Sequence, residues 1–168
     1  MIVSVSKTKS VVRVAMFDAL ILGVICAVPT LSHVLALPLY KMNPMLLCLL
    51  VGMLLVKDRR NAYLLALLMP TVSMMVSGMP VLMKALCMTG ELLTIVGVMQ
   101  LMENGKRKTE NVFLRVLLAI LAGKVVYYAL KALVIAPVVL IETDVWLQLV
   151  VVAVYGVGYG LLKLKIDN

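Results

Sequence analysis

The chain has 168 residues, of which 64% are hydrophobic and only 14% are charged, and its mean hydropathy is +1.11. Soluble domains carry about a quarter charged residues, so this composition excludes an ordinary soluble enzyme and indicates a protein embedded in lipid. The net charge of +8 does not indicate a nucleic-acid partner, because most basic residues lie in short connections between apolar segments. We expect one membrane domain covering residues 1–168.

The apolar segments predict an all-α membrane protein with six transmembrane helices. A helix needs about 20 apolar residues to cross a hydrocarbon core of about 30 Å. Pro44 and Pro80 open helices, since proline suits the first turn, and Pro70 interrupts or kinks another. The predicted spans are residues 11–31, 44–56, 61–76, 80–102, 112–135 and 145–164.

The distribution of basic residues predicts the topology. An even number of spans places both termini on one side of the membrane, and that side holds eleven lysines and arginines. The opposite loops hold Lys41 together with the acidic Glu142 and Asp144. Because basic residues concentrate on the cytoplasmic side, we expect both termini to be cytoplasmic.

Two pairs of ionisable residues lie inside predicted spans, where charges are costly and usually face a partner or a cavity. Lys84 and Glu91 are seven residues apart in the fourth span, and Lys124 and Lys131 have the same spacing in the fifth. The two spans run antiparallel, so Glu91 and Lys124 fall near the midplane and the other two lysines near the outer surface. Where the two faces meet, Glu91 neutralises Lys124.

This arrangement predicts an outward-facing cavity for a small molecule. Cationic groups at its outer end favour an anionic or carboxylate-bearing ligand, and aromatic side chains would form its walls. In the alternative reading, the outer lysines reach toward the headgroups and the midplane pair is structural. The residues expected to bind substrate are Lys84, Glu91, Lys124, Tyr127, Tyr128, Lys131 and Trp146.

Motifs for catalysis and metal binding are missing from the sequence. It has no GxSxG, HExxH or Walker A motif. Cys26, Cys48 and Cys87 are scattered singly through apolar segments, without the spacing of a metal site. His33 has no acidic neighbour and no second histidine. We therefore predict no enzymatic activity, no cofactor and no metal ion.

Small residues at a spacing of four predict close helix packing. Ala15 and Ala19 lie one turn apart in the first span and leave a shallow groove for another helix. Gly156 and Gly160 have the same spacing in the last span. Asp18, alone among apolar neighbours, is either an anchor between helices or a contact for a partner.

The chain resembles the substrate-binding S component of energy-coupling factor (ECF) transporters, the bacterial and archaeal vitamin-uptake family. The resemblance covers the whole length, in size, number of spans and cytoplasmic termini. Ala15-xxx-Ala19 is similar to the family's AxxxA motif. The segment from Met69-Pro70 to Ser77-Gly78-Met79-Pro80 resembles the helix-loop-helix of many members, and Thr89-Gly90-Glu91-Leu92 resembles the pattern that follows it.

The resemblance implies high-affinity binding of a vitamin-like micronutrient from outside the cell. The pocket would lie in the outer half of the membrane, covered by the loops at 32–43, 77–80 and 137–143. Uptake would require a transmembrane T component, docked at Ala15 and Ala19, and two cytoplasmic ATPases. The protein would then lie in the cell membrane of a bacterium or archaeon.

Two other functions are compatible with the sequence. A non-transporting scaffold would resemble the small rod-shape-determining membrane proteins, and would make its contacts through lipid-facing helix surfaces without a ligand pocket. An autonomous permease usually carries a repeat of matched broken helices, and residues 1–80 do not match 81–168 convincingly. A small molecule that co-purifies with the protein would distinguish uptake from scaffolding.

Overall fold

The computed structural model describes the chain except for residues 1, 38, 57, 105–111, 135–144 and 168. The described residues form helices joined by short turns, and no strand occurs among them. The helices are α1 (Ile2–Val34), the 3₁₀ helix η1 (Leu39–Met42), α2 (Pro44–Leu55), α3 (Arg59–Ser77), α4 (Leu82–Asn104), α5 (Val112–Val134) and α6 (Val145–Asp167).

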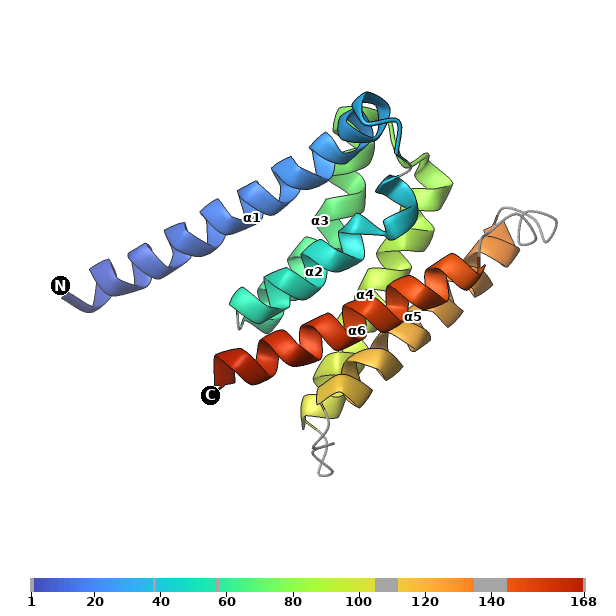
Figure 1. Cartoon of the computed structure of the whole chain (residues 1–168). Coiled ribbons are helices and arrows are strands. Elements are labelled where there is room, and N and C mark those ends of the chain that lie inside the picture. Colours follow the sequence, from blue (N-terminus) through green and yellow to red (C-terminus); the bar gives the residue numbers. More distant parts are fainter. Residues whose placement is uncertain (1, 38, 57, 105–111, 135–144, 168) are drawn as a thin grey trace.

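The helices run alternately in opposite directions, and both ends of the chain lie on the same side of the molecule (Figure 1). The most extensive packing is between α4 and α5, and α3 and α6 pack on either side of this pair. The N-terminal half of α1 extends away from the other helices (Figure 1), and Val12, Met16 and Leu20 are exposed there. One face of α1 is therefore left uncovered by the rest of the chain.

Four of the described helices are long and apolar enough to cross a membrane, with apolar parts at Val11–Val34, Leu82–Glu103, Val112–Leu133 and Leu147–Ile166. The predicted count of six spans is not confirmed. Helix α2 has 12 residues, a length of roughly 18 Å at 1.5 Å per residue, which is short of a hydrocarbon core. Helix α3 opens with two arginines and an asparagine, which shortens its apolar part.

Most helix boundaries differ from the predicted ones by a few residues, but α1 begins at Ile2, nine residues before the predicted start of the first span at Val11. Helix α1 continues to Val34 and α6 to Asp167, because backbone hydrogen bonding continues beyond the apolar part that sequence pattern detects. Helix α4 begins at Leu82, two residues after Pro80. Pro70 does not interrupt α3, which is helical on both sides of it. Membrane helices tolerate proline where neighbouring groups satisfy the freed carbonyl.

The turns before and after α3 follow from local chemistry. The Asp58 side chain accepts a hydrogen bond from the Arg60 backbone N–H at 3.0 Å, which caps the start of the helix. Gly78 ends α3 with a φ of 69°, a left-handed conformation that glycine adopts without strain. The Ser73 and Ser77 hydroxyls both donate to the Met79 carbonyl, at 2.7 and 3.0 Å. These bonds fix the turn that leads into α4.

Two glycines allow α4 and α5 to approach closely. A Cβ atom added to Gly123 of α5 would lie 2.5 Å from Ile95 Cγ1 and 3.0 Å from the Glu91 backbone oxygen of α4. A Cβ atom added to Gly90 would lie 2.6 Å from Leu130 Cδ1. Gly90 and Gly123 directly precede Glu91 and Lys124 in the sequence, so the two helices are in tight contact next to these charged residues.

The predicted packing role of the glycines in α6 is also observed. Cβ atoms added to Gly156 and Gly160 would be in ordinary van der Waals contact with Phe113 of α5, at 3.6 and 3.5 Å. The spacing of four places both glycines against the same aromatic side chain. Helix α6 therefore packs closely on the start of α5.

Candidate ligand cavity

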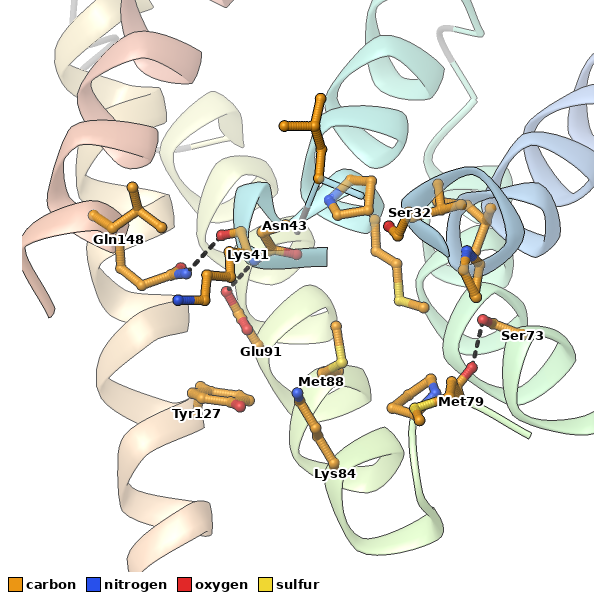
Figure 2. A pocket seen from close by; sticks show the side chains of 18 of the residues that line it. Ser32, Lys41, Asn43, Ser73, Met79, Lys84, Met88, Glu91, Tyr127 and Gln148 are labelled. Atoms are coloured by element: carbon orange, nitrogen blue, oxygen red, sulfur yellow. Dashed lines mark hydrogen bonds between the residues drawn. The ribbon is translucent and has the colours of Figure 1, made fainter. Parts of the chain in front are cut away.

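A cavity of about 730 Å³ lies among α1, the η1–α2 junction, the α3–α4 turn, α4, α5 and α6. Most of its lining is apolar or aromatic, including Ile25, Met45 and Met88. A few polar side chains converge on it (Figure 2). The cavity lies within the volume range of small-molecule sites, and its lining has their usual character.

Glu91 is the centre of the polar network beside the cavity. Its side chain is buried, with 2% of the residue exposed. The Lys124 ammonium nitrogen lies 2.8 Å from Glu91 Oε1, so the predicted ion pair between α4 and α5 is present. Asn43 Nδ2 donates a hydrogen bond to the same oxygen at 3.2 Å (Figure 2). The buried carboxylate is therefore neutralised and tied to the start of α2.

Lys124 connects this carboxylate with α6 and with the aromatic wall. Its ammonium group donates to Gln148 Oε1 at 2.9 Å and lies 5.6 Å from the centroid of the Tyr127 ring, within cation–π range. Tyr127 and Tyr128 pack edge to face, with ring centroids 5.4 Å apart. These contacts fix the side chains that face the cavity from α5.

Polar side chains also hold the η1 segment at the edge of the cavity. Gln148 Nε2 donates to the Lys41 carbonyl at 2.9 Å, and the Tyr155 hydroxyl donates to the Met42 carbonyl at 2.7 Å. Asn43 has a φ of 51°, a left-handed conformation that asparagine tolerates better than most residues. In this conformation its carbonyl-type Oδ1 accepts from Leu46 N, while its amide nitrogen reaches Glu91.

The two lysines predicted at the outer end occupy different environments. Lys84 lines the cavity, is exposed, and extends toward the space beside Met88 and Tyr127 (Figure 2). Lys131 is buried, with 8% exposed, and is not among the lining residues. Its predicted role in ligand binding therefore stays a prediction. On α5 the cavity extends from Lys124 to Tyr128, and Lys131 lies almost one turn beyond it.

The remaining predicted elements of the site are described only in part. Residues of the predicted covering segments 32–43 and 77–80 do border the cavity. The third covering segment, 137–143, lies outside the described residues. The backbone of Trp146 belongs to α6, but its side chain is also outside them.

Asn43, Gln148 and Ser32 are polar residues that line the cavity but were not among the seven residues predicted to bind substrate. Asn43 directly precedes Pro44 at the start of a helix. Asparagine is a preferred N-cap residue and proline a preferred first helical residue, so this pair in the sequence marks Asn43 as the cap of α2. Gln148 is an isolated amide side chain in an apolar helix. Polar side chains inside a membrane-spanning helix indicate a functional site, as charged ones do. Ser32 had no distinguishing signal, because α1 was predicted to end before it.

The predicted docking residues on α1 are exposed. Ala15 and Ala19 are both exposed, and a Cβ atom added to Gly23, one turn further, would meet no atom within 4 Å. Asp18 turns the other way and accepts a hydrogen bond from Asn61 Nδ2 of α3 at 2.9 Å. Of the two roles considered for Asp18, the anchor between helices is the one observed.

No group of three or more metal-ligating side chains occurs in the described part of the chain. His33 lines the cavity, and the three cysteines are free thiols. Comparisons with protein-family models, with curated proteins and with solved structures found no match to this chain.

Proposed function

We propose that the protein binds a vitamin-like micronutrient from outside the cell and serves as the S component of an ECF-type transporter. The observation that carries this proposal is the cavity of about 730 Å³ with its converging polar side chains. A volume in this range accommodates a small molecule of vitamin size. The resemblance in size, α1 motif and turn sequence to the S components supports the assignment to uptake.

The polar network favours ligand binding over scaffolding. Removing two charges from water is costly, and a well-packed apolar pair of the same volume is often as stable or more stable. A scaffold that makes contacts through its outer surface needs neither the Glu91–Lys124 pair nor the Asn43 and Gln148 contacts. A binding protein does need polar groups at fixed positions, because they orient the ligand.

Transport requires partners, since the sequence has no Walker A motif for ATP hydrolysis. We propose that a transmembrane T component docks on the exposed face of α1 around Ala15 and Ala19, where small residues permit close helix contact. Two cytoplasmic ATPases would complete the transporter. The scaffold alternative uses the same exposed face, so docking by itself does not distinguish the two functions.

Mass spectrometry of molecules extracted from the purified protein tests the proposal. Protein from cells grown in rich medium should release a small molecule, and Met88→Trp should reduce its retention because the indole takes up cavity space beside Lys84 and Tyr127. Leu121→Trp is the matched control, since Leu121 is exposed on α5 and is not a lining residue. Absence of any retained molecule in the native protein would favour the scaffold.

A further inference from the structure

Lys84, a lysine that lines the cavity, takes no part in the buried ion pair. The described lining of the cavity contains three lysines, Lys41, Lys84 and Lys124, and one acidic residue, Glu91. Glu91 already lies 2.8 Å from Lys124. Lys84 therefore remains as a lining lysine that has no acidic partner among the described residues.

Lys84 is separated from the neutral pair. Seven residues of helix place it about 10 Å from Glu91 along α4. Among the described residues no hydrogen bond or ion pair engages its ammonium group, and its side chain extends into the cavity space (Figure 2). This group can form a charge-assisted hydrogen bond with an anion that enters the cavity.

A second polar group at the cavity is also without a described partner. The Ser32 hydroxyl oxygen of α1 is buried and has no hydrogen bond to another described residue. Buried hydroxyl groups are normally hydrogen-bonded, and Ser32 lines the same cavity as Lys84.

The walls near Lys84 select for a flat apolar body. Met79 and Met88 lie beside it (Figure 2), and methionine packs favourably against aromatic rings. The Tyr127 and Tyr128 rings stand edge to face on the α5 side, which offers ring surfaces for stacking.

We infer that the cavity selects an aromatic or heteroaromatic monocarboxylate, with its carboxylate on Lys84 and its ring between the methionines and the two tyrosines. This inference rests on the proposed function and specifies its ligand class. A neutral analogue would leave the ammonium group without its counter-charge. A cationic analogue would be repelled by it.

Three probes of nearly equal shape test the charge requirement: 2-naphthoate, 2-naphthamide and 2-naphthylmethylammonium. Their binding to the purified protein in lipid nanodiscs would be measured by equilibrium dialysis. We expect naphthoate to bind at least tenfold more tightly than naphthamide, and the cation to bind least. Lys84→Met should remove the difference between naphthoate and naphthamide, while Lys84→Arg should retain it. Lys165→Met, at the exposed end of α6, should leave it unchanged.

Other outcomes separate the inference from the proposed function. Equal binding of the three probes, or a preference for naphthoate that persists in Lys84→Met, overturns the anion site while leaving a ligand cavity in place. Failure of all three probes to bind, together with no molecule extracted from the native protein, contradicts the cavity and the proposed function alike. Failure of the probes when an extracted molecule is found overturns the aromatic monocarboxylate class alone.

Discussion

At the scale of single residues, Glu91 organises the polar part of the molecule. One oxygen of its carboxylate meets the Lys124 ammonium group and the Asn43 amide. Lys124 in turn reaches Gln148, whose amide holds the Lys41 carbonyl. Helices α4, α5 and α6 and the start of α2 are thus joined through one buried charge, and its neutralisation is a condition for the packing around the cavity.

Removing one partner of this ion pair should be strongly destabilising. Lys124→Met leaves the 2%-exposed Glu91 carboxylate without its counter-charge, and such losses cost about 3–5 kcal/mol. The double variant Glu91→Gln/Lys124→Met should recover most of this loss, because no unpaired buried charge is left. Denaturant titration in micelles measures the free energy of unfolding of each variant.

Lys165→Met is the control for loss of a lysine as such, and we expect a change within about 0.5 kcal/mol at this exposed position. If Lys124→Met were no more destabilising than this control, the ion pair would not hold α4 to α5.

At the scale of elements, the close contact of α4 with α5 determines where the site forms. Gly90 and Gly123 remove two side chains from the contact, and each directly precedes a member of the ion pair. A side chain at Gly123 would meet both Ile95 and the Glu91 backbone oxygen. The backbone oxygen cannot move aside as a flexible side chain can, so the two helices themselves would have to separate.

Gly123→Ala should therefore be destabilising despite the better helix propensity of alanine. Overpacking of a tight contact costs about 1–3 kcal/mol, and we expect the net loss to lie at the lower end of this range. Gly158→Ala on α6 is the matched control, because a Cβ atom there meets nothing within 4 Å. This control should be neutral or stabilising by up to about 1 kcal/mol. The same unfolding titration measures both variants. Equal effects of the two substitutions would show that the contact between α4 and α5 does not require glycine at position 123.

At the scale of the whole molecule, the charge distribution bears on the orientation in the membrane, and the uncovered face of α1 bears on docking of a partner. Basic residues are concentrated toward the termini and the α2–α3 and α4–α5 connections, and the helices place both ends of the chain on one side (Figure 1). The exposed small residues of α1 offer a surface for another helix. The orientation in the membrane and the docking on α1 are accordingly open to direct tests.

Site-specific labelling tests the topology. In a variant with its native cysteines replaced by alanine, a cysteine at Leu35 should react with an impermeant maleimide in right-side-out vesicles. A cysteine at Asp58 should react only after the vesicles are opened, because α2 and α3 would place that turn in the cytoplasm. Labelling of the Asp58 position in intact vesicles would contradict a crossing by α2 and reduce the number of spans.

Substitution on α1 tests the proposed T-component contact. Ala19→Trp should fill the groove between helices and reduce co-purification with a T component at least tenfold, while the retained ligand is unchanged. Leu20→Trp, on the neighbouring exposed position, is the control for bulk alone. Undiminished association of Ala19→Trp would show that the partner docks elsewhere.

Much of the architecture was predictable from sequence, because long apolar segments have few alternatives in a bilayer to the helix. Apart from the start of α1, helix positions were correct to within a few residues. The Glu91–Lys124 pair was correctly predicted from equal spacing on antiparallel spans. Lys131 shows the limit of this reasoning. Spacing gives its position along α5 and its approximate face, but only the packed helices decide which side chains of α5 line the cavity.

The amino-acid sequence by itself determined that the chain is helical and embedded in lipid, and that two of its helices carry ionisable residues within their apolar parts. Each of these properties depends on composition and on spacing along one helix. Only the tertiary structure decided which charges meet and which face open space. The partners of Glu91 come from α2 and α5, and their approach depends on contacts between Gly123 and residues far away in the chain. The cavity itself is formed by side chains from seven helices, and no single segment encodes it.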